Sequence, residues 1–335
     1  MNFIASLKKI TEEIISSDKQ QKKQIEACQA LADLFFKVSG MEHAQTIDTN
    51  GIKTANGVAL GTIDAAACII DAARTHIFLR SVKEAIEDVL SDYPGRPVNI
   101  LYAGTGPYAT LLAPLTTIFI PTQLQMLLLE INPQTIAYLQ TTVAQLNMDA
   151  FVTGIVEADA SEYRLPEGYH PDIIVAETML HALRTEPQVM IFANLINQCT
   201  KKTLLIPQMI QVSAALIKNI DCDTEEVKML KILLKYNAKA ALLVKQNKNE
   251  LPIFTGGEEV VIPEQKDGYS HLALLTNIQV YKNNRLLYKQ SSGLTMPCLV
   301  MDLNSIKKWP AVFNVTYKLG EDPGFQFSFL ENSNK

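Results

Sequence analysis

Two glutamates, Glu177 and Glu186, stand nine positions apart in the stretch AETMLHALRTE (176–186), directly after the apolar run DIIV. One continuous helix, with about 3.6 residues per turn, would place the two acids on opposite sides. Pro187 disfavours helical geometry at Glu186 and suits the first turn of a new helix. We therefore predict a bent loop in which two carboxylates converge, an arrangement that matches a planar, permanently charged guanidinium.

His181 lies inside the same loop and is a candidate base for a proton lost during a transfer reaction. A histidine in a loop is often simply solvated, and two glutamates are also compatible with ordinary surface acids. The loop alone therefore does not define a site, and a second set of residues is needed.

That second set follows the ends of three predicted strands. Gly104 and Gly106 come after the first strand, where glycine allows backbone to approach a ligand closely. Glu130 ends the second strand and can accept the hydroxyl protons of a ribose, and Asp159 ends the third and can accept a hydrogen bond from an adenine amino group. This order indicates an adenosine ligand without a phosphate tail, and S-adenosylmethionine, with S-adenosylhomocysteine as its product, is the candidate cofactor.

The glycine pattern is weak evidence when taken alone. The dinucleotide pattern G-x-G-x-x-G is not met, because Gly106 is followed by Pro-Tyr-Ala, and no Gly-Lys-Ser/Thr phosphate loop is present. Neither NAD nor ATP is therefore supported. A plain turn at the glycines, a solvated strand end at Glu130 and a helix cap at Asp159 remain open alternatives.

Five apolar runs of strand length occupy the middle of the chain. They alternate with stretches that are mostly long enough for crossover helices, which favours an α/β fold with a parallel sheet covered on both faces. The predicted strands are 98–103, 124–131, 151–159, 172–177 and 202–207.

The flanking regions have different patterns. Before the sheet we expect amphipathic helices at 3–16 and 18–38, a polar loop at 41–58, and a helical region at about 59–92. After about residue 210 we expect one charged helix at 223–243, followed by short strands that form an antiparallel β module. The predicted domains are 1–46 (helical), 47–210 (cofactor-binding, with its cap helices) and 211–335 (β-rich).

Composition narrows the class of protein further. A hydrophobic share of 47% and a charged share of 19% are globular values, and a net charge of −5 argues against a nucleic-acid partner and suits a cationic substrate. The opening MNFIASLKKITEE shows no signal peptide and no apolar run is long enough to span a bilayer, so we expect no membrane partner. The five cysteines are scattered without a CxxC motif, which favours a reduced, cytoplasmic protein with no metal site.

At this point the sequence resembles the protein arginine methyltransferase family over roughly residues 60–215. The family's two-glutamate loop matches Glu177 and Glu186, and its helix with Asp, Arg-Thr and an aromatic residue matches DAARTHIF (71–78). The segments GTGP and EINPQ look most like the branch that dimethylates symmetrically. The resemblance implies a Rossmann-like class I methyltransferase sheet with N-terminal helices and a C-terminal β-barrel-like domain. It also implies that Arg74 grips the carboxylate of S-adenosylmethionine.

The implied cofactor site combines the strand ends with the loop. Its residues are Arg74, Ala103, Gly104, Thr105, Gly106, Glu130, Ile131, Asp159, Ala160 and Glu177. Glu177 and Glu186 would act as the catalytic clamp, with His181 as the candidate base.

The sequence departs from the family at several places. Tyr102 and Tyr108 replace residues of the family's glycine motif, and the Thr-His-Trp motif of the barrel is absent, since the one tryptophan is Trp309. These differences favour a small cationic acceptor, most specifically free L-arginine or a related guanidine. The alternatives are a peptide arginine methyltransferase, an N-, O- or C-methyltransferase of another small metabolite, and a non-catalytic scaffold. We also expect a homodimer, formed through the 223–243 helix or the N-terminal helices.

Overall fold

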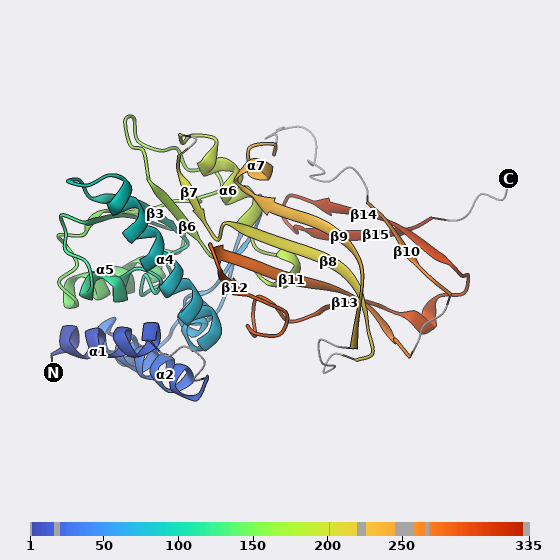
Figure 1. Ribbon diagram of the computed structural model, residues 1–335. Helices are drawn as coiled ribbons and strands as arrows, with labels where there is room; N and C mark the ends of the chain where they lie inside the picture. Colours follow the sequence, from blue (N-terminus) through green and yellow to red (C-terminus); the bar gives the residue numbers. More distant parts are fainter. Residues whose placement is uncertain are drawn as a thin grey trace.

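The computed structural model describes residues 2–16, 21–200, 202–219, 226–244, 258–264 and 268–330. Helices and the parallel sheet occupy the N-terminal part of the chain, and antiparallel strands occupy the C-terminal part (Figure 1). The helix α4 lies between them and contacts strands of both parts.

Two amphipathic helices open the chain, as predicted: α1 (Phe3–Ser16) and α2 (Gln21–Val38), while the predicted residues 18–20 lie outside the described residues. Their buried residues recur every three or four positions, as Leu7, Thr11 and Ile14 do in α1. The two helices pack on each other and on α4, so the N-terminal segment belongs to the main core.

The segment expected to be a polar loop contains a small hairpin after a short 3₁₀ turn, η1 (Met41–His43). Its strands are β1 (Ile52–Thr54) and β2 (Gly57–Ala59), which pair antiparallel. The helical region that follows is interrupted twice rather than continuous. It consists of α3 (Thr62–Ala67), the 3₁₀ turn η2 (Cys68–Ile70) and α4 (Ala72–Asp92).

The parallel sheet confirms the predicted fold class. Its strands are β3 (Val98–Ala103), β4 (Leu124–Glu130), β5 (Val152–Glu157), β6 (Ile173–Ala176) and β7 (Leu204–Ile206). They lie in the order β5-β4-β3-β6-β7, and every pairing is parallel. The connections include η3 (Ala113–Thr117), α5 (Pro133–Gln145), η4 (His181–Leu183) and α6 (Gln188–Ile196). The strand order reverses between β3 and β6, and such a switch point places a ligand crevice at the carboxyl ends of the strands.

The C-terminal part is built from antiparallel strands in two sheets. Its elements are β8 (Met209–Ile217), β9 (Val227–Asn237), α7 (Ala238–Ala241), β10 (Glu258–Ile262), β11 (His271–Tyr281), β12 (Asn284–Leu286), β13 (Cys298–Asp302), η6 (Leu303–Ser305), β14 (Ala311–Lys318) and β15 (Gly324–Phe329). One sheet has the order β12-β11-β8-β9, with β13 also paired to β11, and the other has the order β10-β14-β15. The sheets form the barrel-like module that the sequence predicted.

The helix predicted at 223–243 is wrong for the described residues of that segment. Residues 227–237 form β9, and only the short α7 beyond them is helical, while 223–225 lie outside the described residues. The proposed dimerisation helix is therefore replaced by a strand that pairs with β8. Within the described ranges, no helix is both long and apolar enough to cross a membrane.

Candidate functional site

A pocket opens at the carboxyl ends of β3, β4 and β6, beside the switch in strand order. The turn after β3 forms its floor, where Gly104 and Gly106 adopt positive φ values of 70° and 63°. A Cβ atom at Gly104 would collide with the side chain of Thr178. Glycine is therefore required here both by the backbone conformation and by the close approach of the next loop.

Glu130, at the end of β4, is hydrogen-bonded to this turn. Its Oε2 accepts a hydrogen bond from the backbone N–H of Gly106 at 2.9 Å, and its Oε1 accepts from Ile131 and Asn132 at 2.8 and 3.1 Å. Burial raises the pKa of Glu130, and these three N–H donors oppose that shift. The carboxylate is thus fixed in place and also lines the pocket.

Asp159 follows β5 and lines the same pocket. Its Oδ1 accepts hydrogen bonds from the backbone N–H and the hydroxyl of Ser161, at 2.8 and 2.7 Å. These bonds close a turn, and no helix follows Asp159, so the helix cap considered from the sequence is not formed.

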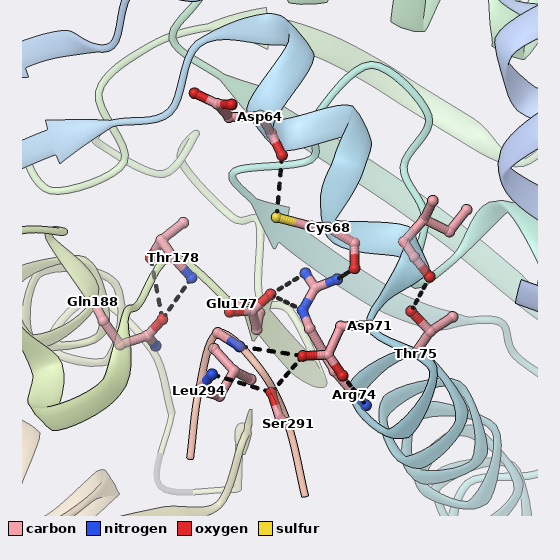
Figure 2. Close-up of polar contacts among 12 residues, drawn as sticks. Asp64, Cys68, Asp71, Arg74, Thr75, Glu177, Thr178, Gln188, Ser291 and Leu294 are labelled. Atoms are coloured by element: carbon pink, nitrogen blue, oxygen red, sulfur yellow. Dashed lines mark hydrogen bonds and ion pairs between the residues drawn. The ribbon is translucent and has the colours of Figure 1, made fainter. Parts of the chain in front are cut away.

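Arg74 and Glu177 form a buried ion pair in the pocket (Figure 2). Nε and one terminal nitrogen of Arg74 contact Oε2 of Glu177, and the other terminal nitrogen donates to the Cys68 carbonyl at 3.0 Å. Both side chains are less than 10% exposed, at 8% and 5%. Burial disfavours the charged guanidinium, but Glu177 outweighs it and raises the pKa of Arg74. Burial also raises the pKa of Glu177, against the stabilising charge of Arg74.

Glu186 enters the same pocket from the far end of the loop. Burial and the neighbouring charge of Glu177 raise its pKa to about 8, and Arg74 opposes this only in part. The two acids that the sequence placed on one loop therefore do line one cavity. They differ in that Glu177 has a cationic partner in the protein.

The loop between the two acids has a strained backbone. Ala182, Leu183 and Thr185 adopt positive φ values of 60°, 53° and 70°, which cost free energy for residues with a side chain. These angles produce the bend that brings residues 177 and 186 to one cavity.

Four backbone groups of this strained loop are hydrogen-bonded to the β-rich domain. His181 N–H donates to the Gly293 carbonyl at 3.0 Å, Ala182 N–H to the Thr276 hydroxyl at 2.7 Å, and Thr185 N–H to the Pro323 carbonyl at 2.9 Å. The Leu183 carbonyl accepts from the Tyr317 hydroxyl at 2.5 Å. The C-terminal domain thus stabilises the loop from behind.

The hairpin β1–β2 forms a further wall of the pocket. Val58 N–H donates to the Thr185 carbonyl at 2.9 Å, and the Asn56 side chain donates to the Ser161 hydroxyl at 2.9 Å. A Cβ at Gly57 would lie 2.7 Å from the Thr185 carbonyl oxygen. The hairpin is therefore packed directly against the segment that carries Glu186.

His181, the predicted candidate base, is not among the residues that line the pocket. Its Nδ1 faces the Gly293 carbonyl at 3.2 Å. Burial and the nearby Arg184 lower the pKa of His181. The structure thus places His181 in the contact with the β-rich domain.

The predicted cofactor residues either line the pocket or lie buried beside it. Of the predicted cofactor residues, the structure brings all but Ala103 to the lining, and Ala103 is fully buried at the end of β3. Sequence reasoning missed several lining residues, namely Thr54, Ala59, Leu60, Ala65, Cys68 and Thr178. The Asn56-Gly57 pair was a hairpin signal that could have indicated the first three. Among the described residues, no group of three or more His, Cys, Asp or Glu side chains could hold a metal ion.

Comparison with solved structures identifies the fold as that of the protein arginine methyltransferases. PRMT1 of Trypanosoma brucei, in a heterotetrameric enzyme–prozyme complex with AdoHcy, matches with a TM-score of 0.54 at 12% identity, covering 80% of this chain and 93% of that chain. Protein arginine methyltransferase 10 of Arabidopsis thaliana, in an open conformation, matches with a TM-score of 0.52 at 11% identity, covering 75% and 86%. No protein-family model and no curated protein sequence matches this chain.

Proposed function

We propose that this protein is an S-adenosylmethionine-dependent N-methyltransferase that acts on the guanidino nitrogen of a small molecule, most specifically free L-arginine or a related guanidine. One observation carries the proposal. Glu177 and Glu186 line a single pocket together with the glycine turn and the strand-end acids Glu130 and Asp159.

The residues of the pocket fit this cofactor. The turn at Gly104–Gly106 lines the pocket, and Glu130 and Asp159 stand where acceptors for ribose hydroxyls and an adenine amino group are needed. Arg74 supplies a cation for the carboxylate of the amino-acid portion. When bound, S-adenosylmethionine supplies an electrophilic methyl group on a sulfonium.

The two glutamates would act on the acceptor in different ways. Arg74 fixes the position of Glu177 and balances its charge, so Glu177 presents one oriented acceptor edge to a guanidinium. Glu186 would ionise as the cation enters and form the second side of the clamp. Fixing the guanidinium in this way can lower a barrier by several kcal/mol, up to about 7–11 kcal/mol in favourable cases.

The enclosed position of Glu186 supports a small acceptor. The hairpin β1–β2 is hydrogen-bonded to the loop beside this residue, at Thr185. The absence of the family's Thr-His-Trp motif and the acidic net charge of −5 point the same way. The second candidate function is transfer to arginine in a peptide. It is favoured by the similarity of the fold to two protein arginine methyltransferases.

The decisive experiment compares acceptors directly. The protein is incubated with isotopically labelled S-adenosylmethionine and either free arginine or an Arg/Gly-rich peptide, and the products are identified by mass spectrometry. We expect label in free arginine. Transfer to the peptide alone would reject the small-molecule proposal. Absence of S-adenosylhomocysteine binding in calorimetry would favour a non-catalytic scaffold.

Glu186→Gln is the variant that tests the clamp most cleanly, because Glu177→Gln would also free Arg74 from its partner. We expect Glu186→Gln to lower turnover by about 100-fold or more, while the affinity for S-adenosylhomocysteine stays within about threefold. Glu157→Gln, at the exposed end of β5, is the matched control and should behave as wild type. Normal methylation by Glu186→Gln would show that the clamp is wrong.

We further propose a homodimer. Light scattering after size-exclusion chromatography tests this, and a mass close to that of one 37.2 kDa chain would reject it.

A further inference from the structure

Asp71 stands at the junction between η2 and α4 and caps the helix that carries Arg74. Its Oδ1 accepts a hydrogen bond from the backbone N–H of Arg74 at 3.0 Å. An aspartate in this position satisfies a free N–H at the start of a helix. The cap therefore fixes the backbone of Arg74, whose side chain reaches Glu177 in the pocket.

The other oxygen of Asp71 binds a turn of the β-rich domain (Figure 2). Oδ2 accepts from the hydroxyls of Ser291 and Ser292, at 2.7 and 3.0 Å, and from the backbone N–H of Gly293 at 3.3 Å. Three donors from one turn thus converge on one carboxylate oxygen, although they lie more than 200 positions away in sequence.

The turn that supplies these donors is itself held by internal hydrogen bonds. Ser291 N–H donates to the Thr295 hydroxyl at 2.9 Å, and Leu294 N–H donates to the Ser291 hydroxyl at 3.0 Å. The Gly293 carbonyl accepts from His181 N–H in the two-glutamate loop. One turn therefore contacts both sides of the site, namely the start of α4 and the loop that carries Glu177.

We propose that Asp71 is a positioning residue, which uses one carboxylate to fix Arg74 and to bind the turn 291–293 of the β-rich domain. The placement of Arg74 opposite Glu177 then depends on the second domain. This inference rests on the proposed function, because it assigns Arg74 to the carboxylate of the cofactor's amino-acid portion.

Asp71→Asn separates the two contacts of this residue. An asparagine has one acceptor oxygen, so it can bind either the N–H of Arg74 or the donors of the turn, but not both. We expect its affinity for S-adenosylhomocysteine to fall about tenfold, which corresponds to about 1.4 kcal/mol. The affinity for 5′-methylthioadenosine, which lacks the amino-acid carboxylate, should stay unchanged, because Arg74 has nothing to bind there.

The two probes distinguish a positioning role from a general structural one. Arg74→Ala should show the same selective loss for S-adenosylhomocysteine, and the double variant should lose little more than either single one. Equal weakening of both probes in Asp71→Asn, or no weakening of either, would overturn the positioning role. If wild-type protein binds neither probe, the proposed function itself fails.

A milder variant covers the case in which Asp71→Asn does not fold. Ser292 is exposed, so Ser292→Ala removes one donor to Asp71 from the surface of the protein. We expect a loss of about twofold to threefold in S-adenosylhomocysteine affinity, with 5′-methylthioadenosine unaffected. The matched control is Ser305→Ala, because this exposed serine bonds only locally to the Asp302 carbonyl. An identical affinity of the two serine variants would contradict the proposal.

Discussion

Glu177 and Glu186 line the same pocket, but their electrostatic surroundings differ. Glu177 forms a buried ion pair with Arg74, whereas burial and the charge of Glu177 raise the pKa of Glu186 to about 8. The pocket therefore holds one acid paired with a guanidinium and a second acid whose raised pKa favours the protonated form at neutral pH. A cationic ligand would change this by favouring the ionised form of Glu186.

This difference predicts that a cationic acceptor displaces a proton. At pH 7, binding of arginine to the complex with S-adenosylhomocysteine should release close to one proton, because Glu186 must ionise. Calorimetry in buffers of different ionisation enthalpy measures the proton directly. Glu186→Gln should release none, and equal release by both proteins would assign the proton to another group.

The same raised pKa predicts how stability changes with pH. The folded protein keeps a proton on Glu186 up to a pKa of about 8, whereas the ordinary value is 4.5, so the folded state binds more protons between these two values. The free energy of unfolding contributed by this group therefore falls as pH rises through that window. Melting temperatures of wild type and Glu186→Gln, measured from pH 5 to 9, should diverge in favour of the variant as pH rises from 5 to 8, and the difference should then stay constant. Parallel curves would contradict the raised pKa.

Among individual residues, the sequence could predict the place of those whose position follows from the order of the strands. Gly104, Glu130 and Asp159 reach the pocket because parallel strands end at one edge of a sheet. His181 could not be placed in this way. The direction of a side chain in a strained loop depends on its partner, here Gly293 on a distant turn. Cys68 lines the pocket without any pattern that would have indicated it.

Among the elements, the hairpin β1–β2 gives the sharpest prediction. Gly57 has a φ of 139° and lies against the backbone of the loop, so a Cβ there would displace either the hairpin or the loop. We expect Gly57→Ala to cost roughly 1–3 kcal/mol of stability and to raise the KM for the acceptor.

Gly95→Ala is the matched control for this substitution. Gly95 also has a positive φ, of 90°, but a Cβ there would meet nothing within 4 Å. Denaturant unfolding and initial-rate kinetics of both variants separate backbone strain from contact with the loop. An unchanged KM in Gly57→Ala would show that the hairpin does not shape the acceptor site.

The strand β9 shows why a local pattern can predict the wrong element. Two irregularities in its pairing with β8 each insert an extra residue, Leu230 and Leu233, into β9. The insertions break the alternation of period two and leave apolar residues at Val227, Leu230 and Leu234, a spacing typical of a helix. Only the pairing with β8 distinguishes a strand from a helix here, and the sequence of the segment alone does not reveal that pairing.

For the whole molecule, buried contacts between the two parts predict a single unfolding transition. Tyr236 of β9 is buried and donates its hydroxyl proton to the Val189 carbonyl of α6 at 2.5 Å. Tyr236→Phe should lower the free energy of unfolding by about 0.5–1.5 kcal/mol. Because many contacts remain, scanning calorimetry should still show one transition.

Tyr93→Phe, at the surface beside Arg96, is the control and should leave the midpoint unchanged. Two separate transitions in Tyr236→Phe would show that the domains are stabilised independently. The overall arrangement could be predicted from the sequence through its resemblance to a family. The two solved structures described above are only 11–12% identical to the chain, so a shared apolar pattern is sufficient for much of the fold.

The hydrogen bonds between the β-rich domain and the backbone of the two-glutamate loop determine what a truncated chain could retain. The loop is encoded within the first 200 residues, but its shape is imposed by side chains and carbonyls from Thr276, Gly293, Tyr317 and Pro323. A fragment that ends after β7 would keep the strand tips and the glycine turn yet lose the template for the bend. If the proposed function holds, we expect removal of the C-terminal half to weaken binding of a cationic acceptor more than binding of the nucleoside.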